Sequence, residues 1–161
     1  MNSPTCFDPK YLHGADTPWL PFTPYNEHVG IKLLHVDPVR GEMALLMRIP
    51  ASTYLGAHNH RGRVVLYTIR GGWRYLEHDW VARTGDFVYE TAGSNHSFQG
   101  EAGEDTEMFI LLDGSLEFLD ENGKIAAIED WKSMLVRLDA HCKAEGIAVP
   151  DLSGFPKAAH G

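Results

Sequence analysis

Hydrophobic and polar residues alternate in short runs through the middle of the chain, and turn-forming residues separate the runs. An alternation with a period of two indicates strands, because successive side chains of a strand point to opposite faces of a sheet. Short strands at such spacing are typical of a β-sandwich or a barrel. The pattern predicts strands at Gly30–Val36, Glu42–Pro50, Tyr54–His60, Val64–Ile69, Trp73–Leu76, Phe87–Glu90, Ser94–Phe98, Met108–Leu112 and Leu116–Leu119.

Two turns between these runs have a residue-level reason. In Asp37–Gly41, a proline fixes φ and the final glycine allows a positive φ. In Asp120–Gly123, the Asn-Gly pair favours a type I′ turn, whose twist matches that of flanking strands. We therefore predict a hairpin at the second of these turns.

The period changes near the C-terminus. From Glu129 to Glu145 the apolar residues recur every three or four positions, acidic residues precede them, and Gly146 follows. This pattern predicts an amphipathic helix packed on the barrel, with an apolar stripe that belongs to the core rather than to a cofactor site. The stripe consists of Trp131, Met134, Leu135, Leu138 and Cys142.

The first 28 residues form a separate, proline-rich arm. Its prolines break any long helix, and its aromatic residues Trp19, Phe22 and Tyr25 are expected to pin it onto the barrel or a neighbouring subunit. We expect a single domain with three parts: the arm at 1–28, the barrel at 29–126, and the helix with its tail at 127–161. Residues 150–161 are predicted to be a loose tail.

Composition and charge narrow the function classes. The chain has 161 residues, enough to bury a core, and a net charge of −8 with scattered basic residues, which argues against nucleic-acid and anionic-membrane partners. Its cysteines, Cys6 and Cys142, do not form a disulfide framework. Because the chain shows neither a signal sequence nor an apolar run of membrane-spanning length, we expect a cytoplasmic protein.

Three histidines carry the candidate chemistry. His58 and His60 have the same parity on one predicted strand, so they share a face, and His96 ends a second block that glycines frame. Three neutral imidazoles facing one cavity suit zinc, iron, nickel or copper. The plainer alternative for the His-x-His pair is a surface or core pair that binds nothing.

The two blocks resemble the paired motifs of the cupin superfamily, and the spacings from His60 to Gly71 and from Gly85 to His96 fit those motifs. The resemblance implies an all-β double-stranded β-helix, or jelly-roll, barrel. The chain departs from the pattern at Val64 or Val65, where many cupins have a glutamate ligand, and at Thr91, where proline is usual. Three histidines would then be the only protein ligands and leave coordination positions open. A degenerate cupin without a metal is the alternative.

Parity also nominates residues around the histidines. Glu90 is expected to face the cavity as an acceptor for an imidazole N–H or as a general base, unless it is exposed at the rim. Arg74 is the predicted cation of the cavity, unless it lies on the surface beside Glu77. Tyr67 and Tyr75 have the other parity and are assigned to the outer face or to packing. Inward apolar residues, which favour a small apolar or aromatic substrate with one chelating end, are predicted at Leu46, Val64, Leu66, Phe98 and Ile110.

A closer resemblance covers most of the chain. Residues 65–80 and 85–90, with the shorter stretches 19–22, 30–34 and 117–123, resemble the 2,4′-dihydroxyacetophenone dioxygenase family and the acetylacetone-cleaving cupins. The resemblance implies an iron(II) centre on His58, His60 and His96 that uses dioxygen to split a carbon–carbon bond beside a ketone. It also implies a glutamate near the site, six residues before the last histidine, and Glu90 has that spacing.

These residues lead to one functional hypothesis and two alternatives. The hypothesis is an oxidoreductase, an iron(II)-dependent dioxygenase for a small aromatic hydroxyketone or 1,3-diketone, with Glu90 and Arg74 as catalytic residues. The alternatives are a non-catalytic metal- or ligand-binding cupin with a sensor or accessory role, and a zinc-dependent isomerase or hydrolase. Zinc, nickel and manganese stay open as metals. We expect a homodimer or homotetramer, without nucleic-acid or membrane partners.

Overall fold

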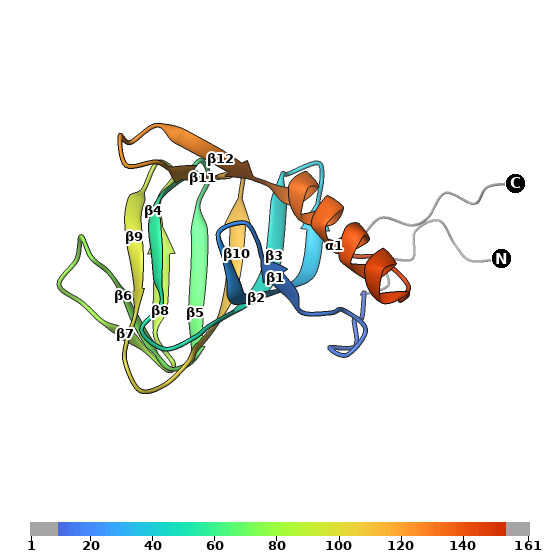
Figure 1. Ribbon diagram of the computed structural model, residues 1–161, viewed down its shortest axis with the longest axis horizontal. Coiled ribbons are helices and arrows are strands. Elements are labelled where there is room, and N and C mark those ends of the chain that lie inside the picture. The colour runs from blue at the N-terminus through green and yellow to red at the C-terminus, as the bar shows by residue number, and fades with distance from the viewer. Residues whose placement is uncertain (1–9, 154–161) are drawn as a thin grey trace, which may run out of the picture.

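The computed structural model describes residues 10–153, so the predictions for Cys6 and for residues 154–161 lie outside the described part of the chain. These residues form two antiparallel sheets, each of six strands, and one helix. The two sheets make up a jelly-roll (Figure 1). The first sheet has the order β1 (Leu20–Phe22), β2 (Asn26–Asp37), β3 (Glu42–Ile49), β10 (Thr106–Asp113), β5 (Val64–Arg70) and β8 (Phe87–Glu90). The second has the order β12 (Ile125–Glu129), β11 (Leu116–Leu119), β4 (Tyr54–His60), β9 (Asn95–Gly100), β6 (Gly72–Tyr75) and β7 (Ala82–Arg83).

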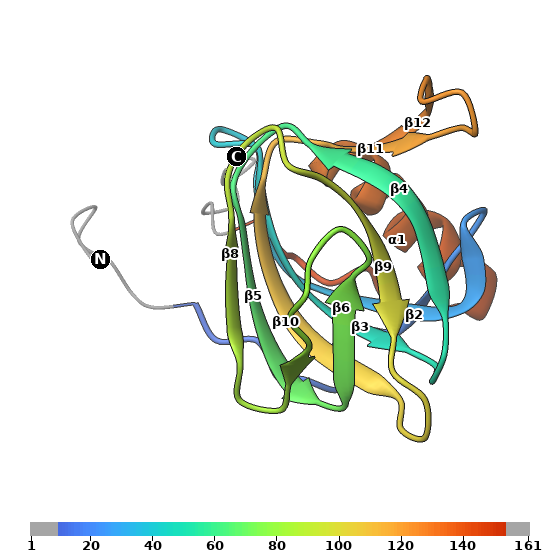
Figure 2. The same cartoon turned by 90° about the vertical axis from the view of Figure 1, so that its left-hand side faces the viewer.

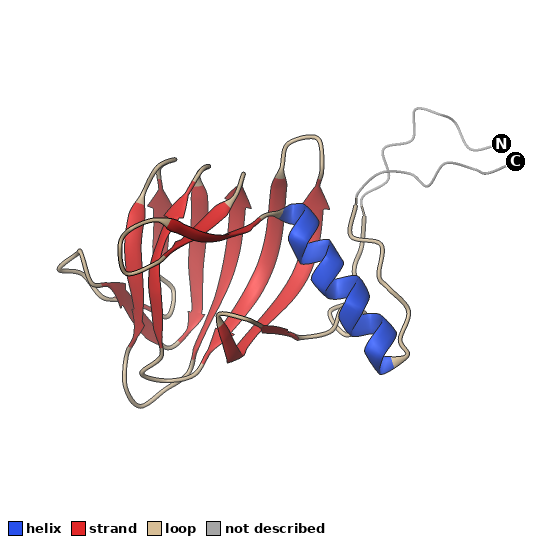
Figure 3. Cartoon of the chain, turned by 45° about the horizontal axis from the view of Figure 1, so that its top comes forward, coloured by secondary structure: helices blue, strands red, loops and turns tan. Residues whose placement is uncertain are grey.

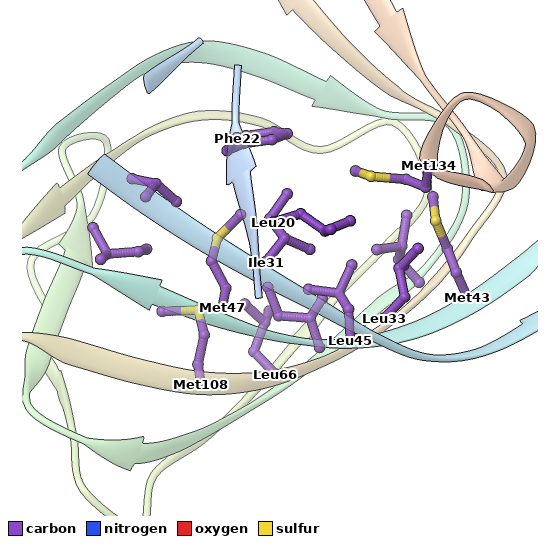
Figure 4. Packing of buried hydrophobic residues seen from close by; sticks show 14 of the residues in the cluster. Leu20, Phe22, Ile31, Leu33, Met43, Leu45, Met47, Leu66, Met108 and Met134 are labelled. Carbon is purple, nitrogen blue, oxygen red and sulfur yellow. The ribbon is translucent and has the colours of Figure 1, made fainter. Parts of the chain in front are cut away.

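The core lies between the two sheets. Along β10 every second residue is buried, and Ile110 pairs with Leu45 of β3 on one side and Leu66 of β5 on the other. Figure 4 shows such side chains converging on one interior, with Met47 and Met108 among them. The period-two alternation of the sequence therefore has its expected cause, since one face of each strand is buried.

Each predicted strand is present. In most of these strands, one or both ends differ from the prediction by a few residues. The prediction missed β1, β7 and β12. Two of these, β1 and β7, are too short to show a period, and Pro21 interrupts β1, which tolerates it as an edge strand. β2 also begins at Asn26, so both β1 and the start of β2 lie within the predicted arm.

The hairpin at residues 120–123 is confirmed, but its predicted turn type is wrong. Within the described residues, Asn122 is not among those with a positive φ, as a type I′ turn would require, whereas Gly123 has a φ of 73°. Instead, the carboxylate of Asp120 accepts hydrogen bonds from the backbone N–H groups of Asn122 and Lys124, both at 2.9 Å. The side-chain cap therefore supports a longer loop.

The helix α1 (Trp131–Glu145) confirms the predicted amphipathic segment. Asp130 caps its N-terminus and Gly146, with a φ of 66°, caps its C-terminus, while Met134, Leu138 and Cys142 are buried. It begins two residues after the predicted start, because Glu129 ends β12. Figure 3 shows it beside one end of the sandwich. Residues 10–153 contain no helix long and apolar enough to span a membrane.

Both ends of the described chain pack on the barrel. Tyr25 stacks on Phe118 with ring centroids 3.8 Å apart, and Phe22 contacts both rings, so the arm is pinned to its own barrel as predicted. The prediction of a loose tail is wrong for residues 150–153. Leu152 is buried, and its carbonyl accepts a hydrogen bond from the backbone N–H of Val36 at 3.0 Å.

Candidate metal centre

Three buried imidazoles meet inside the barrel. His58 and His60 point inward from β4, as their shared parity predicts, and His96 lies opposite His58 on β9. One potential donor atom from each ring lies within 4.8 Å of the other two. The structure therefore brings together the three predicted ligands.

The turn between β8 and β9 fixes the position of His96. Gly93 has a φ of 86°, a conformation that residues with a side chain rarely adopt. Its N–H donates a hydrogen bond of 2.7 Å to the carbonyl of His60. The glycine that frames the second block thus links the turn before His96 to the end of the strand that carries His58 and His60.

Burial keeps the three imidazoles neutral. It lowers the pKa of His58, and it lowers the pKa values of His60 and His96 to about 3, with a smaller contribution from the neighbouring histidines in both cases. The Nδ1 of His58 donates to the carbonyl of Gly56 at 2.9 Å, which leaves its Nε2 as the donor to a metal. Neutral imidazole is the form that binds metal ions.

Two ring nitrogens of the cluster support a metal-binding role. Within residues 10–153, the Nδ1 of His60 and the Nε2 of His96 are buried and have no hydrogen-bond partner. An unpaired buried polar atom is costly, so such atoms commonly have a role that the protein alone does not show. The donor set, its burial and its protonation state fit a divalent metal ion.

Glu90 brings a carboxylate to this cluster. Its Oε2 lies 3.4 Å from the Nε2 of His60 and 3.3 Å from that of His96, and the contact with His96 is a close approach without hydrogen-bond geometry. These contacts are not ion pairs, because both rings are neutral and burial raises the pKa of Glu90 to about 7. The residue is 6% exposed, so the alternative of an exposed residue at the rim is wrong.

The position of Glu90 is related to the missing glutamate ligand. Val64 is buried on β5, directly opposite Glu90 on the adjacent strand β8. A carboxylate therefore reaches the cluster from the strand next to the one that carries this valine. The sequence motif lacks its usual acidic residue, but the site does not.

Tyr75 completes the site, although its parity had assigned it to packing or to the outer face. Its hydroxyl donates a hydrogen bond to the Oε1 of Glu90, and its ring stacks on His96 with centroids 3.5 Å apart. Burial and the charge of Glu90 raise its pKa well above the ordinary value, so the hydroxyl keeps its proton. A charged residue between two aromatic ones, Trp73 and Tyr75, is the signal that could have identified the inward side of this strand.

The prediction that Arg74 lies in the cavity is wrong. Arg74 is exposed, on the face of β6 opposite to Tyr75. Parity had been counted from β5 across Gly71, but β5 and β6 belong to different sheets and Gly71 has a φ of 83°. The count therefore does not carry over from one strand to the next. Glu77, the alternative partner, instead accepts hydrogen bonds from the backbone N–H of Ser97.

Most of the other inward and outward assignments hold. Tyr67 is exposed, and Val64, Leu66, Phe98 and Ile110 are buried as predicted. Leu46 is an exception, because the neighbouring residues Leu45 and Met47 are the buried ones on β3.

Two spaces border the site. The first, here called the interior cavity, has a volume of about 70 Å³ and lies among apolar side chains from both sheets and α1, with His58 and His60 at its border. The second, here called the outer groove, has a volume of about 580 Å³ and is lined by His96, by His78 and residues 80–82 after β6, and by residues 86–91 and Ser94 around β8. Tyr75 and Glu90 border both spaces.

Known proteins share this fold and part of its sequence. The family described as the ChrR cupin-like domain matches residues 8–125. The crystal structure of an RmlC-like cupin protein from Ralstonia eutropha JMP134 is 44% identical, with a TM-score of 0.89 over 92% of this chain and 96% of that one.

Three further matches carry a description of their role. The acetylacetone-cleaving enzyme of Acinetobacter johnsonii is 26% identical over 133 residues, 76% of this chain and 83% of the relative. A solved acetylacetone dioxygenase from the same bacterium shares the fold, with a TM-score of 0.73 and 18% identity over 87% of this chain and 96% of that one. The Rhodobacter sphaeroides structure of SigE with the anti-sigma ChrR also shares it, with a TM-score of 0.52 and 21% identity over 61% of this chain and 50% of that one.

Proposed function

This chain belongs to the ChrR cupin-like domain family, and we propose that it is a metal-dependent dioxygenase. The reaction would cleave a carbon–carbon bond next to a ketone in a small aromatic hydroxyketone or a 1,3-diketone. The observation that carries the proposal is the buried cluster of three neutral imidazoles with Glu90 beside it. The similarity to the acetylacetone-cleaving enzyme supports the class of reaction.

His58, His60 and His96 would hold the metal, with iron(II) as the proposed ion. A bound iron(II) supplies a Lewis acid for the ketone oxygens and one-electron chemistry with dioxygen. Zinc, nickel or manganese would fit the same nitrogens, so the donor set alone does not select iron.

Glu90 is the proposed general base. Because its pKa is raised to about 7, its carboxylate can accept a proton from the carbon next to the ketone near neutral pH. Tyr75 holds this carboxylate through its hydroxyl and packs its ring on His96, so it positions the base relative to the cluster. The enolate that forms is an anion suited to a cationic centre. One dioxygen is then consumed per substrate, and its two atoms end in the two carbonyl or carboxylate fragments. Arg74 has no part in this proposal.

Metal analysis and an oxygen electrode test the proposal. We expect iron in the purified protein and oxygen uptake that depends on an added 1,3-diketone or hydroxyacetophenone. His96→Ala should lose both bound metal and uptake, whereas His28→Ala, which removes an exposed histidine, should keep both. Zinc without oxygen uptake would instead support an isomerase or a hydrolase, and unchanged uptake in His96→Ala would refute the assignment.

The family also supports a second candidate, a non-catalytic binding module. One structural neighbour is the complex of SigE with the anti-sigma ChrR, and ChrR gives the family its description. A protein that retains metal but consumes no oxygen with any ketone tested would favour this candidate. A homodimer or homotetramer stays a prediction, which light scattering of the purified protein tests.

A further inference from the structure

We propose that dioxygen and the organic substrate approach the cluster from opposite sides. Dioxygen would occupy the interior cavity and the organic substrate the outer groove. This inference rests on the proposed function, and it assigns a ligand class to each of the two spaces.

The Tyr75–Glu90 pair borders both of these spaces. Both side chains are almost fully buried, and the hydrogen bond between them joins β6 of one sheet to β8 of the other. His58 and His60 border the interior cavity, whereas His96 borders the outer groove. The cluster can therefore be approached from either side, and ligands on the two sides do not share a space.

The size of the interior cavity excludes an aromatic ring. An apolar cavity of about 150 Å³ in a protein accepts benzene or xenon. The interior cavity has about half that volume, 70 Å³, which is enough for a diatomic gas or a xenon atom. Organic ligands usually occupy pockets of roughly 300–1,000 Å³.

The lining of the interior cavity agrees with an apolar guest. Away from the cluster it consists largely of side chains such as Met47, Leu66 and Ile110, which offer no hydrogen bonds. Glu129 also borders this space, but its carboxylate already accepts hydrogen bonds from Tyr25, Ser133 and Arg137. Dioxygen is apolar and needs no hydrogen-bond partner, so it suits this cavity better than water does.

The outer groove has the size and the chemistry for a planar aromatic ketone. Its volume of about 580 Å³ lies within the usual range for organic ligands. The rings of His78 and Trp80 stack at 5.4 Å on the segment after β6, and Phe87, 62% exposed, lies on β8. Figure 2 shows the loop between β6 and β7 at the open side of the barrel. An aromatic ring would lie against these side chains, with its carbonyl end toward His96 and Glu90.

Xenon tests the interior cavity without relying on activity. We expect crystals of the wild-type protein under xenon pressure to show one xenon atom among Met47, Leu66 and Ile110. Ile110→Phe should fill the space and remove this xenon, whereas Ile128→Phe, the same change at an exposed residue of β12, should retain it. A wild-type interior without xenon would overturn the inference.

Kinetics and soaking experiments test the division between the two ligands. Ile110→Phe should raise the KM for dioxygen at least threefold and leave the KM for the ketone unchanged, and Phe87→Ala should do the reverse. Crystals soaked with 4-hydroxyacetophenone should show its ring in the outer groove. A ring in the interior cavity, or an Ile110→Phe variant that raises only the KM for the ketone, would refute the division. If no oxygen is consumed at all, the proposed function fails, but xenon and the soaked ketone still report on the two spaces.

Discussion

Glu90 places a carboxylate 3.3 and 3.4 Å from two imidazoles that burial keeps neutral. Burial raises the pKa of Glu90 to about 7, because removal from water disfavours the ionised carboxylate. A metal ion on the three histidines would place a positive charge beside this carboxylate and favour its ionised form. The ionised Glu90 is therefore unfavourable for folding without a metal ion, and a bound metal ion would stabilise it.

The cost of burying an ionised carboxylate predicts how Glu90→Gln changes the stability of the metal-free protein. The folded-state pKa of Glu90, about 7, lies above the ordinary 4.5, so the carboxyl group favours folding below pH 4.5 and loses that contribution as the pH rises through 7. At 1.36 kcal/mol per pKa unit, the penalty of the ionised group is roughly 3 kcal/mol. We expect metal-free Glu90→Gln to exceed the wild type in free energy of unfolding by about 2–3 kcal/mol at pH 8, and by little at pH 5, in urea titrations. An equal gain at both pH values would contradict this origin.

Tyr75 is expected to act through Glu90. Its hydroxyl lowers the pKa of that carboxyl group, so Tyr75→Phe should raise the pKa while the ring still packs on His96. A hydrogen bond to a charged group contributes about 1.5–3 kcal/mol. We expect the acidic limb of the pH profile of kcat/KM to move up by about one pH unit, with activity recovered at high pH.

Tyr67→Phe is the matched control for this variant, because Tyr67 is exposed on the outer face of β5. Its pH profile should coincide with that of the wild type. If Tyr75→Phe lowered kcat/KM equally at every pH, Tyr75 would have a structural role only.

The orientation of side chains was predicted correctly from the sequence where it depended on one strand alone. His58 and His60 share a face because a single residue separates them on β4, and Glu90 was placed correctly relative to His96. It failed for Arg74 and Tyr75, because their orientation depends on how the chain crosses from one sheet to the other at Gly71. That crossing is a feature of the tertiary structure, and the hydrophobic periodicity of a single strand does not predict it.

At the scale of elements, the turn between β8 and β9 connects backbone conformation to the site. Gly93 has a positive φ, and a Cβ at this position would have no atom within 4 Å, so its substitution introduces strain without a clash. Gly103 has the same character, with a φ of 94°, but its loop joins β9 to β10. A comparison of substitutions at Gly93 and Gly103 therefore distinguishes the general cost of backbone strain from a local effect on the histidines.

Gly93→Ala is expected to weaken metal binding. The strain costs roughly 1–2 kcal/mol, and relief of this strain would shift the hydrogen bond from Gly93 to His60 and the start of β9. We expect zinc affinity, measured by competition with a chromogenic chelator, to fall several-fold. Gly103→Ala should lose similar stability in urea and keep its affinity; equal affinities in the two variants would show that the turn does not position the ligands.

Capping residues and hydrophobic periodicity were sufficient to predict the elements that consecutive residues encode. Asp130 and Gly146 mark the ends of α1, and a long run of alternation marks β10. β1 and β7 have few residues of their own and exist because neighbouring strands pair with them. Such strands can be recognised only once the sheets are assembled.

For the whole molecule, the two sheets close around a cluster that has no positive charge of its own. His58 and His60 come from one strand, His96 from the next, and Glu90 from the opposite sheet. A metal ion held by the three histidines would therefore bind the folded state far better than the unfolded chain. Such binding stabilises a protein by about 2.7 kcal/mol when the free ligand is at a hundred times its Kd.

Metal loading should therefore raise the melting temperature. For a chain of this size each kcal/mol shifts Tm by about 2–4 °C, so we expect a rise of roughly 5–10 °C with iron(II) under anaerobic conditions or with zinc. His96→Ala should show little of this rise, because two imidazoles remain, and His28→Ala should show all of it. Glu90→Gln should gain less from metal than the wild type does, since its site no longer carries the charge that the metal neutralises. A Tm independent of metal in the wild type, measured by differential scanning calorimetry, would show that the three histidines are only a buried polar cluster.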